Sequence, residues 1–265
     1  MKEIKNIVIT GASSGIGLET AKYLTEKGYR VFGLARKKVE GLGFEILECD
    51  VTNYARVKQC FDEIEVTAGS IDVLINNAGM GISGAMEYTE QSEIDKIVNL
   101  NLLAVINASK TVIPYMRRGG GGKIINMSSV GAVIPLPFQA CYSATKAGLQ
   151  TFSLALRLEV KDFNIDVSCV LPGDTKTNFT SAREKSSVEI DDVYGDRIKR
   201  SVDKMEKDEL NGMPAISVSK VIYKIIKKRR SPACKTVGFS YKIIVLLTKI
   251  LPTKLILFIV KKMYG

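Results

Sequence analysis

The sequence predicts an α/β fold in which a parallel sheet is covered by helices on both faces. Six short runs are apolar almost throughout and rich in β-branched residues, and segments with helical spacing separate them. Strands without polar alternation are buried on both faces, as in a parallel sheet between two helical layers. A chain of 265 residues is long enough to bury a large core in one such domain.

The expected strands and helices alternate along most of the chain, with a weaker seventh strand at Lys235–Phe239. No internal repeat or long linker divides the chain. The clear strands are expected at Ile4–Thr10, Val31–Ala35, Glu45–Glu48, Ile71–Asn76, Lys123–Met127 and Ile165–Leu171, and the helices at about 15–27, 53–67, 90–113, 142–162 and 217–228.

Composition excludes several kinds of function. The chain has no histidine, which removes Ser-His-Asp and Cys-His nucleophilic machinery and most transition-metal sites, so we expect no metal. Its five cysteines are scattered without a C-x-x-C pair, as expected in a reducing cytoplasm. The net charge of +10 arises in residues 217–265, which hold 12 basic and no acidic residues. Because no basic face with interleaved aromatic residues or reader motif is present, we expect no nucleic-acid partner.

A glycine-rich turn follows the first expected strand and opens a helix. Thr10–Gly17 has the sequence TGASSGIG. Glycines let the backbone turn sharply and approach a pyrophosphate, whose charge is stabilised by amides at the helix N-terminus. A tight turn without a ligand has the same composition, and the position after a first strand favours the dinucleotide site.

Further motifs accompany this turn: Asn76-Asn77-Ala78-Gly79, Asn101, Ser129, Tyr142-Ser143-Ala144-Thr145-Lys146 and Pro172-Gly173. In order and spacing, residues 4 to about 240 resemble the short-chain dehydrogenase/reductases. The resemblance implies a Rossmann-type fold, a doubly wound parallel seven-stranded sheet with helices on both faces. It also implies an oxidoreductase that uses a nicotinamide dinucleotide.

The resemblance also implies which residues bind the cofactor. The segment at Asn77 is expected along the adenosine ribose, and Asp50 with Val51 beside the adenine. Only 13 residues separate Arg36 from Asp50, so the helix usual between the second and third strands must be very short or absent. The implied cofactor-binding residues are Gly11, Ser13, Ser14, Gly15, Ile16, Gly17, Arg36, Asp50, Val51, Asn77, Ala78, Gly79, Tyr142, Lys146, Pro172, Gly173, Thr175 and Thr177.

The end of the second strand favours NADP(H) over NAD(H). NAD enzymes usually place an acidic side chain here to accept hydrogen bonds from the ribose hydroxyls. Ala35 stands at that position and Arg36 follows it. A guanidinium can hold the 2′-phosphate of NADP through two hydrogen bonds. A solvated loop end is the alternative interpretation of this basic residue.

The catalytic candidates are Tyr142, Lys146, Ser129 and Asn101. Tyr142 and Lys146 are four residues apart and therefore share one helix face. The ammonium, with an oxidised nicotinamide, is expected to lower the phenol pKa so that Tyr142 can act as acid or base. Ser129, selected over Ser128 by the resemblance, would stabilise the developing oxyanion. In the family, the residue at Asn101 holds a water in a proton relay.

The stretch from Gly173 to Pro214 interrupts the regular alternation after a strand end, where a substrate lid is expected. Asp174 is an unusual neighbour for Pro172-Gly173. The expected pocket wall is apolar, which suits a lipophilic carbonyl or alcohol. Its members are Met80, Ile134, Pro135, Leu136, Phe138, Cys141 and Phe179.

Residues 241–265 form a basic, apolar extension beyond a catalytic domain at 1–240. It resembles the C-terminal extension of 17β-hydroxysteroid-dehydrogenase-like and retinol-dehydrogenase-like members. Lys249, Pro252 and Lys254 interrupt its apolar run, which excludes a transmembrane helix of about 20 residues. Two interpretations stay open: helices packed over the pocket or a neighbouring subunit, or peripheral membrane contact through residues 240–265.

The sequence thus predicts a cytoplasmic NADP(H)-dependent oxidoreductase that interconverts a secondary alcohol and a ketone on a lipophilic substrate, with Tyr142 as acid or base. A homodimer or homotetramer is expected through the helices at about 90–113 and 142–162. One alternative is a 3-oxoacyl-thioester reductase whose basic tail receives an acidic carrier protein. Another is a dinucleotide-sensing protein without catalysis, although this chain keeps both Tyr142 and Lys146.

Overall fold

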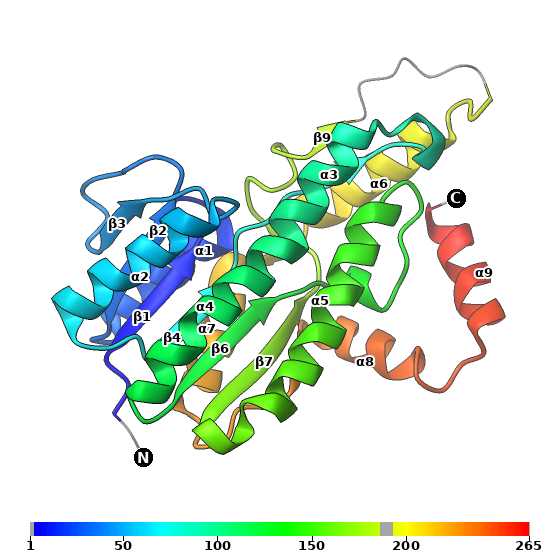
Figure 1. The fold of residues 1–265 in the computed structure, drawn as a ribbon. Coiled ribbons are helices and arrows are strands. Elements are labelled where there is room, and N and C mark those ends of the chain that lie inside the picture. The colour runs from blue at the N-terminus through cyan, green and yellow to red at the C-terminus, as the bar shows by residue number, and fades with distance from the viewer. Residues whose placement is uncertain (1–2, 186–192, 265) are drawn as a thin grey trace.

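A sheet of seven parallel strands forms the centre of the molecule (Figure 1). The structure is a computed structural model that describes residues 3–185 and 193–264. Across the sheet the order is β11-β7-β6-β4-β1-β2-β3, which confirms the predicted doubly wound fold. The strands are β1 (Asn6–Thr10), β2 (Arg30–Ala35), β3 (Glu45–Glu48), β4 (Val73–Asn76), β6 (Gly122–Met127), β7 (Ile165–Pro172) and β11 (Cys234–Val237).

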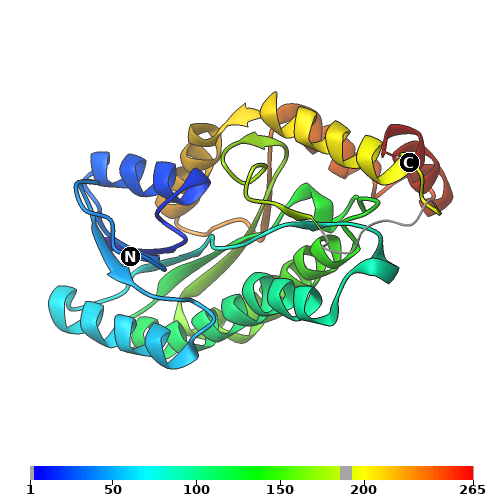
Figure 2. The ribbon, with the colours of Figure 1, turned by 90° about the horizontal axis from the view of Figure 1, so that it is seen from above.

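Helices cover both faces of the sheet (Figure 2). Helices α1 and α7 pack on one face, and α2, α4 and α5 pack on the other. The helices are α1 (Gly15–Glu26), α2 (Tyr54–Ala68), α3 (Gln91–Val98), α4 (Ala104–Arg118), α5 (Ala140–Glu159), α6 (Arg197–Leu210), α7 (Ala215–Lys227), α8 (Phe239–Leu247) and α9 (Thr253–Tyr264).

Alternate residues of β1 face the two helical layers. Ile7 and Ile9 belong to the core formed with α1 and α7, whereas Val8 belongs to the core formed with α2 and α4. All three side chains are fully buried. Because successive side chains of a strand point to opposite faces, a strand between two helical layers has to be apolar at every position. This requirement makes β1 recognisable from sequence.

The order of the chain through the sheet reverses beside β1. Its neighbours are β2 on one side and β4 on the other, and the chain reaches β4 only after crossing back over the sheet. Loops at the carboxyl ends of strands diverge at such a point and leave a crevice. The glycine-rich turn after β1 and the segment after β4 therefore meet at the natural ligand site of this fold.

The longest helical segment is Gln91–Arg118, which runs through α3, a π-helical turn at Asn99–Leu103, and α4. Within residues 3–185 and 193–264 it is the one helix long and apolar enough to cross a membrane, and its buried face packs in the core beside the sheet. It ends later than the predicted helix at 90–113 because Pro114 is accommodated inside α4.

Residues 36–44 contain no helix, which confirms the prediction made from the short spacing between β2 and β3. The predicted lid region contains α6 and three two-residue strands, and its residues 186–192 lie outside the described part of the chain. The sequence pattern does not single out α6, because most of its 14 residues are charged or polar. The short strands are β8 (Thr175–Lys176), β9 (Glu184–Lys185) and β10 (Met213–Pro214).

Candidate active site

One large cavity opens at the carboxyl ends of the central strands. Its volume of about 1570 Å³ exceeds the roughly 300–1,000 Å³ of ordinary ligand pockets, so a dinucleotide and a substrate fit together. Gly17 and Asn101 do not line it and are buried. The predicted site residues that line it are Gly11, Ser13, Ser14, Gly15, Ile16, Arg36, Asp50, Val51, Asn77, Ala78, Gly79, Ser129, Tyr142, Lys146, Pro172, Gly173, Thr175 and Thr177.

The turn after β1 has a shape that depends on its glycines. Gly11 and Gly15 adopt left-handed φ angles of 66° and 53°. A Cβ on Gly17 would lie 2.2 Å from the Gly11 carbonyl oxygen, so α1 can approach the strand this closely only with glycine there. No side-chain hydrogen bond from Ser14 caps α1, and its first turn has no acidic residue. Free amides at this helix end fit a pyrophosphate.

Asn77 ties this turn to the end of β4. Its amide nitrogen donates to the carbonyl oxygens of Thr10 and Gly11 at 3.1 and 3.2 Å. In return, the Thr10 hydroxyl accepts hydrogen bonds from the backbone N–H groups of Asn77 and Ala78 at 2.9 and 3.0 Å. These four bonds fix both walls of the crevice before any ligand arrives, which preorganises the cavity for a dinucleotide.

The cavity wall just after β2 carries a positive charge without a partner in the described part of the chain. Arg36 is exposed just after β2 and makes no hydrogen bond or ion pair with a described residue. Just after the neighbouring strand β3, Asp50 accepts hydrogen bonds from the Thr52 backbone and hydroxyl at 2.9 and 2.7 Å. The Asp50 carboxylate is therefore held by its own turn, while the Arg36 guanidinium stays available to an anionic group.

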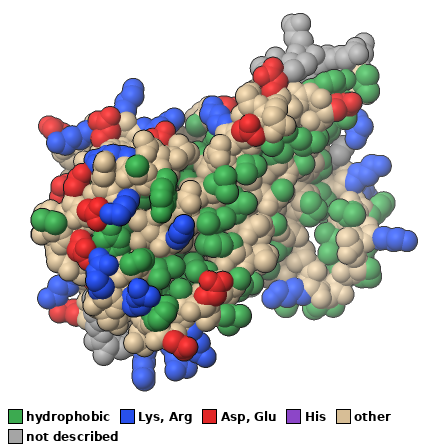
Figure 3. All heavy atoms as spheres, viewed as in Figure 1, with side chains coloured by type: hydrophobic (Ala, Val, Ile, Leu, Met, Phe, Trp, Pro, Cys, Tyr) green, Lys and Arg blue, Asp and Glu red, His purple; other side chains and the backbone are tan. Residues whose placement is uncertain are grey.

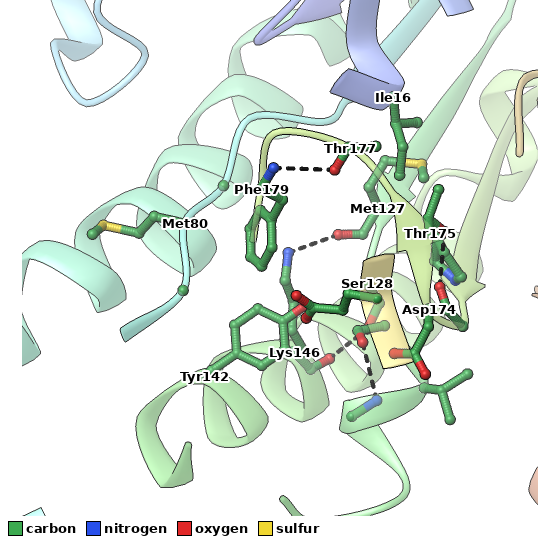
Figure 4. A pocket seen from close by; sticks show the side chains of 18 of the residues that line it. Ile16, Met80, Met127, Ser128, Tyr142, Lys146, Asp174, Thr175, Thr177 and Phe179 are labelled. Carbon is green, nitrogen blue, oxygen red and sulfur yellow. Dashed lines mark hydrogen bonds between the residues drawn. The ribbon is translucent and has the colours of Figure 1, made fainter. Parts of the chain in front are cut away.

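Tyr142 lies half-buried near the start of α5 and points into the cavity (Figure 4). Its ring lies beside that of Phe179, with ring centroids 6.1 Å apart. The Ser129 hydroxyl at the end of β6 interacts with the phenol oxygen. A substrate oxygen placed between these two hydroxyls would meet both a proton donor and a second hydrogen-bond donor.

The pKa of Tyr142 is shifted upward, and the main cause is burial. The Ser129 hydroxyl acts to lower it, whereas the carboxylates of Glu209 and Asp174 act to raise it. Sequence reasoning expects Lys146, with an oxidised nicotinamide, to lower this pKa. The protein alone shows the opposite direction because desolvation of the phenolate outweighs its stabilisation.

Lys146 is buried one helical turn after Tyr142, and its Nζ lies 5.8 Å from the centroid of the tyrosine ring. The ammonium donates to the Met127 carbonyl oxygen at 2.9 Å. Burial lowers the pKa of Lys146 to about 8. Gly79 lies close by, and a Cβ there would come within 3.5 Å of this Nζ and within 3.2 Å of Asn101 Oδ1.

The structure separates the two candidate serines at the end of β6. Ser128 is buried and donates its hydroxyl to the Lys146 carbonyl oxygen at 2.8 Å, which anchors α5 to the sheet. Ser129 instead lines the cavity, accepts a hydrogen bond from the Gly131 backbone at 3.0 Å and faces Tyr142. The geometry therefore favours Ser129, as the sequence spacing does.

Asn101 occupies the π-helical turn between α3 and α4 and is fully buried. Its side chain forms two hydrogen bonds with the backbone of Met80, accepting from N–H and donating to C=O, both at 2.9 Å. Its amide nitrogen also lies 3.4 Å from the Thr145 hydroxyl oxygen. Asn101 thus fixes the segment that follows β4, and π-turns of this kind often mark functional sites.

A family model described as short chain dehydrogenase matches residues 5–187. The chain belongs to the short-chain dehydrogenase/reductase family. Members of this family bind a nicotinamide dinucleotide, and the glycine turn, the free helix terminus and the cavity described above fit that group. The subgroup suggested by the C-terminal extension stays a prediction.

Relatives of this short-chain dehydrogenase/reductase include several reductases. It is 44% identical over 234 residues to a 3-ketodihydrosphingosine reductase of Bacteroides thetaiotaomicron, covering 88% of this chain and 87% of that one. It is 34% identical over 194 residues to the 3-oxoacyl-[acyl-carrier-protein] reductase FabG of Staphylococcus aureus, covering 69% and 79%. A solved short-chain dehydrogenase from Streptomyces avermitilis superposes with a TM-score of 0.81 at 27% identity, covering 93% of both chains.

The residues that line the substrate end of the cavity in this short-chain dehydrogenase/reductase are only in part those predicted from the sequence. Met80, Ile134, Leu136 and Phe179 line the cavity. Pro135, Phe138 and Cys141 do not, and this part of the prediction is wrong. The side chain of Phe138 turns away to pack against Tyr194 with ring centroids 5.9 Å apart, and Cys141 contacts Met86.

Helices α8 and α9 supply wall residues that the sequence analysis does not assign to the pocket. Their inner faces contribute Tyr241, Ile244, Ile256 and Val260 to the cavity lining, together with Thr248 at the end of α8. No local motif marks these positions, and the broad apolar character of residues 239–263 is the only signal in the sequence. The extension therefore closes over the substrate end, which was one of its two open interpretations.

Proposed function

We propose that this protein is an NADP(H)-dependent oxidoreductase that interconverts a secondary alcohol and a ketone on a lipophilic substrate. The observation that carries the proposal is that Tyr142, Ser129 and Lys146 share one cavity with the glycine-rich turn. Four of the predicted apolar residues and two C-terminal helices enclose the substrate end of that cavity. An apolar chain attached to the carbonyl is better accommodated there than a free sugar.

When bound, a reduced nicotinamide dinucleotide supplies the hydride that forms the new C–H bond at the carbonyl carbon. Tyr142 donates its phenolic proton to the carbonyl oxygen, so that the C=O becomes CH–OH. Its raised pKa keeps the phenol protonated at neutral pH, as an acid requires. Ser129 donates a hydrogen bond to the same oxygen as negative charge develops there. In the oxidative direction Tyr142 must first lose its proton.

Lys146 and Asn101 have supporting roles in this proposal. The Lys146 ammonium would bind the hydroxyls of the nicotinamide ribose and favour the phenolate of Tyr142 once the reaction has removed its proton. Its hydrogen bond to Met127 fixes its position. Asn101 holds the loop at Met80 and contacts Thr145, one residue before Lys146.

The preference for NADP(H) is supported by the charge at the end of β2. Arg36 is exposed, lines the cavity and has no partner in the described part of the protein. Ser13 and Ser14 also line the cavity and supply hydroxyl donors. A 2′-phosphate would receive a bidentate guanidinium contact here, whereas the unphosphorylated ribose would not use this charge.

The substrate to test first is 3-ketodihydrosphingosine, because the relative with 44% identity is named for its reduction. A second candidate is a 3-oxoacyl thioester, since FabG is also a relative and the exposed lysines of the extension could receive an acidic carrier protein. If the substrate is a long-chain ketone, deleting residues 240–265 should impair the reduction of any such ketone. If it is a 3-oxoacyl thioester, the deletion should impair only the reduction of the carrier-bound form.

The deciding experiment follows NADPH oxidation with ketones of increasing chain length, with 3-ketodihydrosphingosine and with 3-oxoacyl thioesters. Tyr142→Phe is expected to reduce kcat by a factor of ~10²–10⁴ while dinucleotide binding is retained. Wild-type turnover by this variant would refute the assigned acid. Binding of NADPH without turnover of any substrate would favour a dinucleotide-sensing protein instead.

The proposal also includes a cytoplasmic homodimer or homotetramer. Apolar side chains are exposed along the predicted contact helices, with Leu103 43%, Leu154 39% and Leu158 76% exposed. The last two lie on α5, which packs beside the π-helical turn that carries the first. Burial of this strip against a second copy would remove it from water.

A further inference from the structure

Exposed apolar side chains are concentrated on α8, α9 and the turn between them. Ten of the 20 large hydrophobic side chains that are exposed in the described residues lie between Phe239 and Met263. Phe239 is 80% exposed, Ile250 70% and Phe258 63%. Figure 1 shows the two helices projecting from the side of the domain, and Figure 3 shows hydrophobic and basic side chains together in that region. Patches of this kind usually bind a partner.

The charge of this surface has a single sign. Residues 239–265 contain five lysines and no acidic residue. All five lysines are exposed, and none forms an ion pair with a residue in the described ranges. A surface that combines long basic side chains with apolar ones is complementary to an anionic lipid headgroup layer above acyl chains. The five lysines are Lys242, Lys249, Lys254, Lys261 and Lys262.

The same two helices form part of the cavity wall. Their inner side chains line the substrate end, as described above. Phe239, Leu247, Ile259 and Met263 line the cavity and are nevertheless between 41% and 80% exposed. The cavity lining and the exposed apolar side chains therefore belong to the same α8–α9 segment, residues 239–264, and acyl chains would contact these side chains favourably.

The lengths of the two helices determine how they can meet a membrane. Helix α8 has nine residues and α9 has 12, which correspond to roughly 13 and 18 Å. A hydrocarbon core of about 30 Å is too thick for either helix to cross. Both can lie in the plane of the interface, with their apolar side chains inserted below the headgroups and the lysines reaching the phosphates.

We propose that the α8–α9 segment docks on an anionic lipid surface and opens the substrate end of the cavity toward the acyl chains. A substrate with a long alkyl chain then passes from the bilayer into the cavity without crossing water. The docking itself rests on the exposed residues and lysines of this segment, whereas the passage of substrate rests on the proposed ketone reductase function.

The binding experiment measures sedimentation of the intact protein with vesicles of phosphatidylcholine, with and without phosphatidylglycerol. We expect binding only with the anionic lipid, and a loss of at least tenfold in the double variant Ile250→Glu/Phe258→Glu. Neither of these residues lines the cavity. Val66→Glu, at an 88% exposed position on α2, is the matched control and should bind as the wild type does.

A second experiment tests the contribution of the lysines by replacing Lys249 and Lys254 with glutamine. The control is the same substitution at the exposed Lys22 of α1. The double variant should need at least fivefold more anionic lipid for half-maximal binding, and the control should not. Thermal unfolding and NADPH binding verify that each variant is folded. Absence of wild-type binding to anionic vesicles, or equal binding by the Ile250→Glu/Phe258→Glu variant, would overturn the proposal.

Kinetics and oligomeric state distinguish the remaining outcomes. Ile250→Glu/Phe258→Glu should leave the reduction of a short water-soluble ketone unchanged and lower that of a long-chain ketone in anionic vesicles at least tenfold. If vesicles bind but no ketone is reduced, the proposed function fails and the docking stands. If the same variant changes a dimer into a monomer in lipid-free analytical ultracentrifugation, this face joins two copies and the docking proposal is wrong.

Discussion

The Tyr241 hydroxyl donates a hydrogen bond to the carboxylate of Asp174, 67 residues earlier in the chain. The tyrosine ring also covers Gly173, where a Cβ would lie 2.0 Å from a ring carbon. Near the other end of the extension, Tyr264 donates to Asp208 on α6 at 3.3 Å. Two tyrosine–carboxylate hydrogen bonds therefore fasten the C-terminal helices to the region around the cavity, and they explain the unusual acidic residue after Pro172-Gly173.

Removing the Tyr241 hydroxyl should loosen the extension. Tyr241→Phe leaves the half-buried Asp174 carboxylate without this donor, at a cost of about 1–3 kcal/mol in the free energy of unfolding. The pKa of Asp174, already raised by burial, should rise further. Urea unfolding measures the first effect, and faster tryptic cleavage at Lys242 reports local release. Tyr54→Phe, at an exposed ring, is the control, and equal effects of the two substitutions would contradict a stabilising role of the Tyr241–Asp174 hydrogen bond.

The close approach of α1 to β1 predicts a strong effect of Gly17→Ala. The added Cβ would lie 2.2 Å from the Gly11 carbonyl oxygen, so α1 has to shift away from the strand. Dinucleotide affinity should fall at least tenfold, and stability by about 1–3 kcal/mol, as is typical of overpacking. Fluorescence titration with NADPH and thermal unfolding test this. Gly148→Ala on α5, where the Cβ would be 3.6 Å from Leu102, should leave both properties nearly unchanged.

Cofactor preference should depend on Arg36. Because its guanidinium has no partner in the described protein, Arg36→Ala should weaken NADPH binding by about tenfold to a hundredfold, the order of one strong charge-assisted contact. NADH binding should change less than twofold. Dissociation constants for both dinucleotides measure the effect, with Lys38→Ala as a nearby basic control. Equal losses for NADPH and NADH would refute the phosphate contact.

Stability should rise with pH in the range where Lys146 titrates. Burial lowers the pKa of this lysine from 10.5 to about 8, so below pH 8 the folded protein carries a buried charge that destabilises it. Between pH 8 and 10.5 the unfolded chain keeps a proton that the folded protein has lost, and the free energy of unfolding increases with pH. The total change is about 3 kcal/mol at most.

Lys146→Met lacks this titrating group and provides the reference. Its advantage in the free energy of unfolding over the wild type should be greatest below pH 8 and should shrink as the pH approaches 10.5. Urea unfolding of both proteins at pH 7, 8, 9 and 10 gives the difference, because groups that do not interact with Lys146 titrate alike in the two proteins. Parallel curves for the two proteins would contradict the assigned shift.

The exposed apolar strip on α5 predicts the effect of Leu158→Glu. Because the leucine is 76% exposed, it contributes little to the stability of the folded monomer. The free energy of unfolding of the variant should therefore lie within about 0.5 kcal/mol of the wild-type value. A charge buried at a subunit contact should nevertheless lower the oligomeric state. Analytical ultracentrifugation measures this, with Val66→Glu as the control. An unchanged assembly in Leu158→Glu would place the contact elsewhere.

Much of the site could be predicted because short segments carry it. The turn at Gly11 to Gly17, the helical spacing of Tyr142 and Lys146, and the position of Ser129 at a strand end are all local properties. The upward shift of the Tyr142 pKa could not be predicted, because it depends on burial and on the carboxylates of Asp174 and Glu209. The direction of the Phe138 side chain could not be predicted from a local pattern either, since it depends on packing against Tyr194.

The sequence alone located the strands of the central sheet and the helices that alternate with them, though not α6, since each buried strand had to be apolar throughout. Each glycine of the phosphate turn likewise satisfied a local backbone demand. Tertiary structure decided what closes the substrate end. Tyr241 and Asp174 meet only because the chain returns through β11 beside β7, which brings the extension to the cavity. Contacts between residues so far apart depend on the packed sheet, and no local sequence pattern specifies them.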